Sequence, residues 1–280
     1  MEKPLKNLLH EHGFSLKKAY GQNFLTDRCL LDEIVSKAGV TKDDVVLEIG
    51  CGAGALTTSL AKKAKKVLGY EIDVKLEPIL KEVLQEYDNV TVNFSDVMKN
   101  KMSDIEKKLG EKYFLVANLP YYITTPIVMR FLEEAKNIKG MIIMVQEEVA
   151  LRFAAKEGTS DYGAITVGIN LRGSSEIVMR VPRDKFTPPP NVDSAVVKIT
   201  VDENKFKGVS FEKVRNVVRV AFSSRRKMLV NNLMNGFKLS RVAAEEALDR
   251  AGIERTVRGE ALSAEDFVKL TDAVYECIEA

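Results

Sequence analysis

The chain has 280 residues, of which 45% are hydrophobic, and a formal net charge of +2. This length is enough for one large domain and one small one, and no apolar run approaches the ~20 residues of a membrane span. The first 13 residues are charged and lack the apolar core of a secretory signal, so we expect a cytoplasmic protein without a membrane partner.

Cysteine and histidine are too few and too scattered for most metal centres. The cysteines, Cys29, Cys51 and Cys277, are widely spaced, which indicates reduced thiols without a zinc spacing. The only histidines, His10 and His12, lie in the N-terminal arm. We therefore expect neither a metal site nor a histidine-based catalytic triad.

The first half of the chain alternates short apolar strands with amphipathic helices. Strands are predicted at 45–49, 67–72, 90–94, 113–117 and 140–146. A helix is expected at about 74–87, with Pro78 in its first turns, and another up to about Lys136, with Thr125 as N-cap and Pro126 at the first helical position. Two further strand patterns, at 164–171 and 194–201, would complete the sheet as a hairpin-like pair. Such alternation predicts a mainly parallel sheet covered on both faces.

Helical periodicity takes over after residue 210. Ser210, Ser240 and Ser263 are predicted N-caps, and Asp266 follows Ser263 at the spacing of a capping box. We place a domain boundary near residues 202–208.

Four polar segments lie at the predicted carboxyl ends of strands, where open α/β sheets bind ligands. The first is the turn with Gly50, Gly52 and Gly54, preceded by Glu48, where backbone can approach a ligand closely. Glu71 ends the next strand, about 20 residues after the glycines, and a carboxylate at this spacing can bind ribose hydroxyls. Asp96 and Asn118 end the two strands that follow. Because Gly50, Gly52 and Ala55 also satisfy the dinucleotide pattern, a nicotinamide-dependent dehydrogenase remains an alternative at this point.

The segment Asn118-Leu119-Pro120-Tyr121 combines an amide, a proline-fixed turn and an aromatic ring. An amide oxygen and a backbone carbonyl can accept two N–H bonds, and a ring can stack on a base. The segment therefore suits a flat, weakly nucleophilic NH2 group such as the exocyclic nitrogen of adenine.

Positive charge gathers in the last third of the chain. From Lys205 to Arg241 the only acid is Glu212, and the run Arg225-Arg226-Lys227 interrupts a helical pattern. A basic face of this kind predicts binding to RNA or DNA.

In order along the chain, these motifs resemble those of class I S-adenosylmethionine methyltransferases, which implies a Rossmann-like, mainly parallel seven-stranded sheet with a small C-terminal helical domain. Nearly the full length, including Gly21 to Leu25 and Phe186 to Ser194, resembles the KsgA (RsmA) family of rRNA adenine N6,N6-dimethyltransferases. Many relatives carry proline at the position of Cys51. This departure from the family pattern affects the rigidity that we expect for the glycine turn.

The resemblance implies domains at 1–25 (an arm with a cofactor-closing segment), 26–204 (methyltransferase) and 205–280 (RNA binding). It implies a monomer that uses S-adenosylmethionine, releases S-adenosylhomocysteine, and dimethylates two adjacent adenosines in the 3′-terminal hairpin loop of 16S rRNA in an immature 30S subunit. The implied cofactor-binding residues are Asn23, Leu25, Glu48, Gly50, Gly52, Gly54, Glu71, Ile72, Asp96, Val97 and Asn118. The implied catalytic residues are Asn118, Leu119, Pro120, Tyr121 and Phe186, and the RNA-binding residues are Arg225, Arg226 and Lys227.

Two alternatives share these features. One is a macrolide-resistance methyltransferase of 23S rRNA, and the other is a non-catalytic RNA-binding assembly factor that keeps the cofactor fold.

Overall fold

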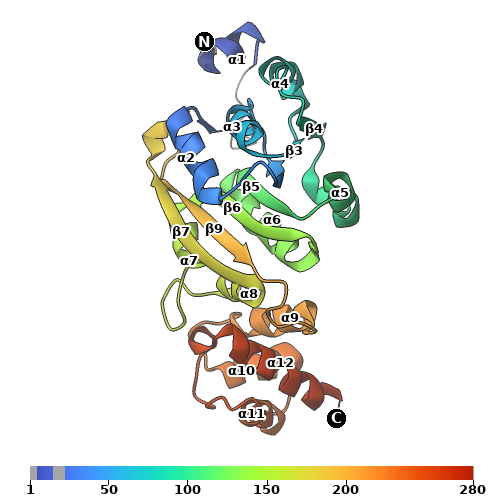
Figure 1. The fold of residues 1–280 in the computed structure, drawn as a ribbon. Helices are drawn as coiled ribbons and strands as arrows, with labels where there is room; N and C mark the ends of the chain where they lie inside the picture. Colours follow the sequence, from blue (N-terminus) through green and yellow to red (C-terminus); the bar gives the residue numbers. More distant parts are fainter. Residues whose placement is uncertain (1–4, 15–22, 280) are drawn as a thin grey trace. The chain divides into compact units, whose positions relative to one another are not determined.

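The computed structural model describes residues 5–14 and 23–279, and these form two compact units (Figure 1). The first unit holds the described residues up to Ala150 together with Glu176–Val201, and the second holds Leu151–Ser175 and the described residues from Asp202 onward. The segment 151–175 therefore groups with the helical end of the chain.

A seven-stranded sheet organises the first unit, in the order β4-β3-β2-β5-β6-β9-β7. Strands β2 to β6 run parallel to one another, and β9 runs antiparallel to its neighbour β6. The order reverses at β2, so the carboxyl ends of β2 and β5 border a topological switch point, where such sheets bind ligands. The strands are β2 (Val45–Ile49), β3 (Lys66–Glu71), β4 (Val90–Phe94), β5 (Tyr113–Asn118), β6 (Ile138–Gln146), β7 (Gly173–Val181) and β9 (Ser194–Val201).

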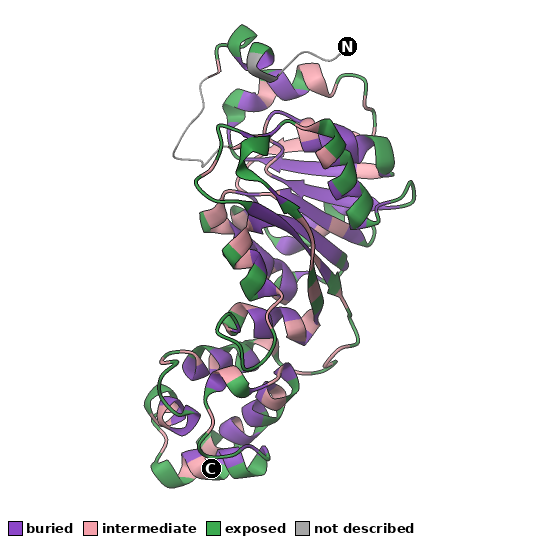
Figure 2. Cartoon of the chain, turned by 90° about the vertical axis from the view of Figure 1, so that its left-hand side faces the viewer, coloured by how far each residue is buried: buried purple, intermediate pink, exposed green. Residues whose placement is uncertain are grey.

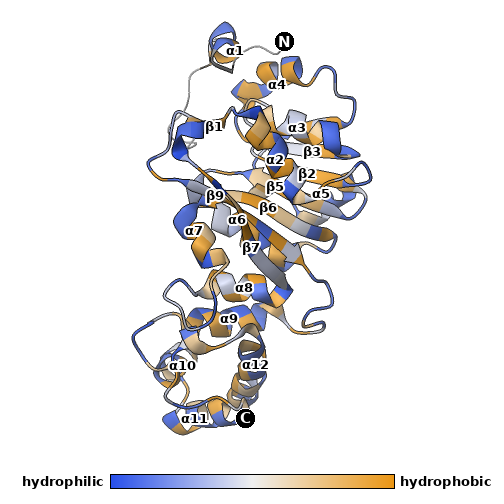
Figure 3. Cartoon of the chain, turned by 60° about the vertical axis from the view of Figure 1, so that its left-hand side comes forward, coloured by the Kyte–Doolittle hydropathy of each residue, from blue (hydrophilic) through white to orange (hydrophobic). Residues whose placement is uncertain are grey.

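Helices cover both faces of this sheet, since all five residues of β2 are buried. The strands form the buried and most apolar layer of the unit, while the outer helix faces are polar (Figures 2 and 3). A core cluster joins α2 and α3 to one face of the sheet, and α5 and α6 contact β2 and β6. The helices are α1 (Leu5–Glu11), α2 (Arg28–Ala38), α3 (Ala55–Lys63), α4 (Glu77–Val83), α5 (Met102–Leu109), α6 (Tyr121–Glu134) and α7 (Glu147–Phe153), the last of which crosses into the second unit.

A separate two-stranded ladder connects two distant parts of the first unit. Strand β1 (Phe24–Leu25) pairs antiparallel with β8 (Phe186–Thr187), so that Leu25 lies opposite Phe186. The segment before the glycine turn is thereby hydrogen-bonded to the segment that follows β7.

The second unit is helical and has its own core, to which Tyr162, Leu233 and Phe267 contribute fully buried side chains. Ser210 and Ser240 cap their helices, and Ser263 and Asp266 exchange hydrogen bonds as a capping box, as predicted. The helices are α8 (Ala164–Arg172), α9 (Phe211–Ala221), α10 (Leu229–Phe237), α11 (Arg241–Arg250) and α12 (Ala264–Glu279), with a 3-10 turn at Gly259–Ala261.

Five of the predicted parallel strands and the strand at 194–201 are confirmed within one or two residues. The prediction of a strand at 164–171 is wrong: this segment is helix α8, and β7, which neighbours β9, follows it. The helix with Pro126 begins at Tyr121, so Pro126 lies inside it rather than at its first position. The helix predicted at 74–87 is a 3-10 turn (Val74–Leu76) followed by the shorter α4.

Candidate active site

A cavity of about 340 Å³ lies at the carboxyl ends of β2, β3, β4 and β5. Most of the residues predicted from sequence to bind the cofactor or the target base line it. Glu48 and Gly54 do not, and Gly21 and Gln22 of the predicted closing segment lie outside the described residues. The predicted residues that line the cavity are Asn23, Leu25, Gly50, Gly52, Glu71, Ile72, Asp96, Val97, Asn118, Leu119, Pro120, Tyr121 and Phe186.

The glycine turn (residues 50–54) brings backbone to the cavity wall. Gly50, Gly52 and Gly54 have φ values of +82°, +55° and +86°, a region that side chains rarely adopt. A Cβ on Gly52 would lie 2.8 Å from the Phe24 ring. Only glycine therefore allows β1 to lie this close over the turn.

Two carboxylates organise the next two loops while keeping lone pairs for a ligand. Glu71 accepts the backbone N–H groups of Gly52 and Asp73, both at 2.8 Å. Asp96 accepts the N–H of Met98 at 2.9 Å. A carboxylate has about four acceptor positions, so further donors can bind to each. Burial raises the pKa of the Glu71 carboxyl.

An arginine that the sequence did not single out holds the Asp96 loop in place. From α6, Arg130 donates to the carbonyl oxygens of Val97 (2.8 Å) and Asn100 (2.6 Å). The carboxamide of Asn100 donates to the Asp96 carbonyl at 2.8 Å. The cavity wall formed by Asp96 and Val97 is therefore fixed from the neighbouring helix.

Charge in the cavity favours a cationic ligand over a pyrophosphate. Among the described residues, its lining contains Glu71 and Asp96 but no lysine or arginine. Glu71 also occupies the Gly52 N–H, one of the donors that a pyrophosphate would need at this turn. Ile72, which is 50% exposed, adds an apolar surface between the two acids.

Glu48 lies beneath the turn and outside the cavity. Its side chain is fully buried, and neither carboxyl oxygen has a hydrogen-bond partner among the described residues. Burial raises the pKa of Glu48 to about 8. Cys51 is also buried. A Cβ on Gly69 would lie 2.4 Å from the Cys51 Sγ, so the thiol packs closely against β3.

Asn118 ends β5 at the cavity, and its carboxamide has no hydrogen-bond partner in the described part of the chain. The Leu119 side chain is buried, and Pro120 is the N-cap residue of α6. A Cβ on Gly50 would lie 3.4 Å from the Asn118 carbonyl oxygen, so the glycine turn and this segment meet across the switch point.

Tyr121 and Phe186 provide the aromatic walls. The Tyr121 hydroxyl lies 2.9 Å from the Ser194 hydroxyl on β9, and Ser194 is fully buried. In the sequence, Ser194 stands out only as the last residue of the segment from Phe186 to Ser194. The structure adds that its hydroxyl anchors the Tyr121 ring. Phe186 is 4% exposed, so most of its ring packs in the core and only part of it reaches the cavity.

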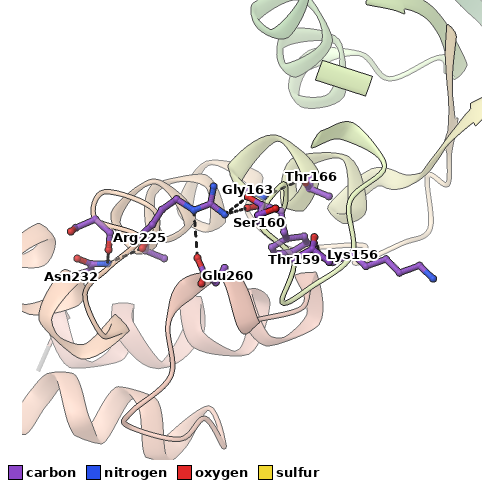
Figure 4. A network of polar contacts seen from close by, with 11 residues as sticks. Lys156, Thr159, Ser160, Gly163, Thr166, Arg225, Asn232 and Glu260 are labelled. Atoms are coloured by element: carbon purple, nitrogen blue, oxygen red, sulfur yellow. Dashed lines mark hydrogen bonds and ion pairs between the residues drawn. The ribbon is translucent and has the colours of Figure 1, made fainter. Parts of the chain in front are cut away.

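The three predicted RNA-binding residues lie in a turn between α9 and α10, which we call the basic turn (residues 223–228). Arg225 is used within the protein: it donates to the carbonyls of Ser160 (2.7 Å) and Tyr162 (2.9 Å) and lies 3.4 Å from Glu260 (Figure 4). Arg226 and Lys227 are exposed, with no ion pair among the described residues. The run thus separates into one internal anchor and two surface cations.

Comparison with known proteins identifies the family. The model of the ribosomal RNA adenine dimethylase family matches residues 13–275. The chain belongs to this family. It is similar to the ribosomal RNA small subunit methyltransferase A of Geobacillus thermodenitrificans (46% identity, covering 96% of this chain and 94% of the relative) and of Bacillus pumilus (44%, covering 98% and 96%).

Solved structures agree in fold. A dimethyladenosine transferase from Plasmodium falciparum superposes with a TM-score of 0.75 at 29% identity, covering 88% of this chain and 95% of that one. The 23S rRNA methyltransferase ErmE gives 0.68 at 30%, covering 90% and 100%. The chain is an rRNA adenine methyltransferase with the predicted fold, and the dehydrogenase alternative is wrong.

Membrane-spanning helices and clusters of metal-binding side chains are absent from the described residues. None of their helices is long and apolar enough to span a membrane. No group of three or more His, Cys, Asp or Glu side chains among them could hold a metal ion.

Proposed function

We propose that this protein transfers methyl groups from S-adenosylmethionine to N6 of two adjacent adenosines in the 3′-terminal hairpin loop of 16S rRNA, dimethylating each. It would act as a cytoplasmic monomer on an immature 30S subunit. The observation that carries the proposal is the Asn118 carboxamide, which lies at the main cavity without a partner in the described chain. A free amide beside an apolar cavity is suited to a neutral base with an NH2 group.

The cavity residues fit S-adenosylmethionine. Glu71 would bind the ribose hydroxyls, Asp96 the adenine amino group and Ile72 the adenine ring, while the glycine turn and Asn23 would hold the methionine end; all of these residues line the cavity. The two acids, and a lining without basic side chains in the described part of the chain, suit a ligand with a sulfonium and an ammonium group. When bound, this cofactor supplies a methyl group already activated by the positive sulfur.

The residues of this chain would then align the nucleophile. Adenine N6 is a poor nucleophile because its lone pair is delocalised into the ring. The side-chain oxygen of Asn118 and the carbonyl of Leu119 would each accept one N6–H bond, which turns the lone pair toward the methyl group. Positioning of this kind can contribute about 7–11 kcal/mol.

The two acceptors also oppose the positive charge that N6 gains in the transition state. A strong general base is unnecessary, because the cationic product can lose its proton to water afterward. Tyr121, anchored through Ser194, would stack on the target base, and such stacking is worth about 1–3 kcal/mol per base. Phe186 would close the opposite side as a partly exposed edge.

The main alternative is methylation of 23S rRNA. The fold does not separate the two substrates, since ErmE superposes at a TM-score of 0.68. Identity favours the small-subunit substrate: the curated relatives at 43–46% identity are named small subunit methyltransferases, whereas ErmE is 30% identical.

The test is methyl transfer from radiolabelled S-adenosylmethionine to unmethylated 30S subunits, 50S subunits and free 23S rRNA, with mass mapping of the products. We expect label on 30S alone, at two adjacent adenosines near the 3′ end of 16S rRNA. Label on 23S rRNA, or no label with any substrate while the cofactor still binds, would reject the proposal.

A further inference from the structure

One exposed aromatic side chain lies at the mouth of the main cavity. Tyr122 lines the cavity and is 67% exposed. In the described part of the chain it is the only exposed aromatic side chain, since the others are buried or half-buried. Single exposed apolar side chains are common on protein surfaces and need no explanation. Tyr122 differs from these because it is an aromatic residue that is both exposed and part of the cavity wall.

The position of Tyr122 on its helix separates it from the core. With about 3.6 residues per turn, Tyr122 projects roughly opposite to the buried face of α6. No ring contact joins it to another described aromatic residue, and its hydroxyl has no hydrogen-bond partner in the described part of the chain. Packing therefore does not account for an aromatic side chain here. The residues that α6 buries are Thr124, Ile127, Val128, Phe131 and Leu132.

The two consecutive tyrosines are held differently. The hydroxyl of Tyr121 lies 2.9 Å from that of Ser194, which fixes the Tyr121 ring in the cavity wall. The Tyr122 ring has no such anchor, so it can turn against a flat partner at the mouth. Val192, two residues before Ser194 and 44% exposed, adds apolar surface beside the anchor. One fixed ring and one free ring can thus contact two different bases.

The charge of the cavity lining favours a base over a phosphate as the partner of the free ring. No lysine or arginine among the described residues lines the cavity. An RNA backbone at the mouth therefore meets no cation of the lining, whereas a base there meets an exposed aromatic ring. Stacking on such a ring tolerates any base, because every base has a π-face.

The proposed reaction brings a base of this kind to the mouth. To enter the cavity, the target adenine must leave its stack. The nucleotide that is covalently joined to it stays outside and loses a stacking partner. The ring of Tyr122, adjacent in the chain to the ring that contacts the target, can replace this partner.

We propose that Tyr122 is a stacking platform for the base next to the adenosine that is being methylated. This inference rests on the proposed function and deepens it. One adenine lies in the cavity against Tyr121, while the neighbouring base lies on Tyr122 at the mouth. The platform offsets part of the cost of flipping the target, because the neighbour regains the stacking that it lost. This contact is the same before and during methyl transfer, so it acts on KM and not on kcat.

The first test is steady-state methyl transfer to unmethylated 30S subunits by the full-length protein. Tyr122→Ala should raise the KM for 30S about tenfold, with kcat changed by less than about twofold. Tyr122→Phe should retain the wild-type KM, because stacking needs the ring and not the hydroxyl. Tyr122→Leu keeps an apolar side chain without a ring and should resemble Tyr122→Ala. Tyr87→Ala, at a tyrosine outside the cavity lining, is the matched control.

The second test identifies the base that stacks on the platform. Binding is measured in the presence of S-adenosylhomocysteine with a synthetic RNA hairpin that has two adjacent adenosines in its loop. In two further hairpins, one or the other adenosine is abasic. The wild-type protein should bind at least one abasic hairpin about tenfold more weakly than the parent hairpin. Tyr122→Ala should bind that abasic hairpin and the parent with similar affinity, because the ring and the base act as a pair.

An unchanged KM of Tyr122→Ala for 30S would overturn the inference, and so would an equal loss of affinity by this variant for all three hairpins. A loss in Tyr122→Phe as large as in Tyr122→Ala would also overturn it. Thermal unfolding and S-adenosylhomocysteine binding should match the wild type, because the side chain is exposed. Failure of the proposed function is visible separately, as the absence of methyl transfer to 30S by the wild-type protein, whereas the hairpin test requires no methyl transfer.

Discussion

The main cavity and the basic turn differ in how their polar side chains are paired within the protein. In the cavity, backbone groups and carboxylates satisfy one another, as in the Gly52–Glu71 contact, and the Asn118 carboxamide has no partner among the described residues. In the basic turn, the function of each cation depends on whether the protein has already used it, as Arg225 and Arg226 illustrate. Adjacent residues of the same type can therefore have different roles, and only their hydrogen bonds separate them.

The largest effect is expected at the unpaired amide of the cavity. Asn118→Ala removes an acceptor that acts on the transition state, so kcat should fall about 10²- to 10³-fold or more, the range for loss of one such group. The measurement is single-turnover methyl transfer to 30S. S-adenosylhomocysteine affinity, by calorimetry, should change far less, and a large parallel loss of cofactor binding would contradict a catalytic role.

A substitution in the glycine turn should mainly weaken cofactor binding. Gly52→Ala places a Cβ 2.8 Å from the Phe24 ring at φ +55°. The strain of a left-handed residue costs about 1–2 kcal/mol. If the unliganded turn relaxes to relieve it, binding must restore the strained conformation, which corresponds to roughly tenfold weaker binding before the clash is counted. Calorimetric titration with S-adenosylhomocysteine checks this. Ala53→Gly, one residue on, is the control and should retain most of the affinity; equal losses in the two variants would show that general flexibility matters instead.

Arg225 and Arg226 provide the direct test of the comparison. Arg225→Ala should lower the free energy of unfolding by about 1 kcal/mol, because the exposed carbonyl of Ser160 and the partly buried carbonyl of Tyr162 lose a charged donor that is itself partly exposed. Arg226→Ala should leave thermal unfolding unchanged and weaken 30S binding in a salt-dependent way. If the two variants unfold at the same temperature, the proposed internal role of Arg225 is incorrect.

A further prediction concerns the pH dependence of stability. The pKa of Glu48 rises from 4.5 to about 8 in the folded protein, so between these values the native state keeps a proton that the unfolded chain has lost. Glu48 therefore makes stability fall as pH rises through this window. Glu48→Gln should remove that slope, so its melting temperature relative to wild type should increase from pH 5 to pH 8. A difference independent of pH would mean that Glu48 is ionised in the native protein.

Much of the first unit could be predicted because its strands are short apolar runs bounded by polar or glycine-rich turns. The position of Asn118 and the acids at strand ends follow from that pattern. Segment 164–171 was misread because it is rich in β-branched residues, a weak preference that burial of Val167 and Leu171 in the helical core overrides. The prediction of Pro126 as a helix start is wrong because the five residues before it are already helical.

The remaining features depend on contacts across long sequence separations. Arg130 reaches back to Val97 and Asn100, and Tyr121 reaches Ser194, more than 70 residues away. Nothing local in the sequence marks these partners. The distinction between Arg225 and Arg226 has the same origin, because it depends on a loop some 60 residues upstream.

The short ladder between β1 and β8 has a consequence for the order of events. Phe24 and Leu25 border the glycine turn, and the strand they pair with carries Phe186. A displacement of one strand to admit a ligand must break or drag the hydrogen bonds of the other. A ligand that enters by displacing one strand thus bears the free-energy cost of moving both segments, and by reciprocity a second ligand that needs the same displacement finds it already made.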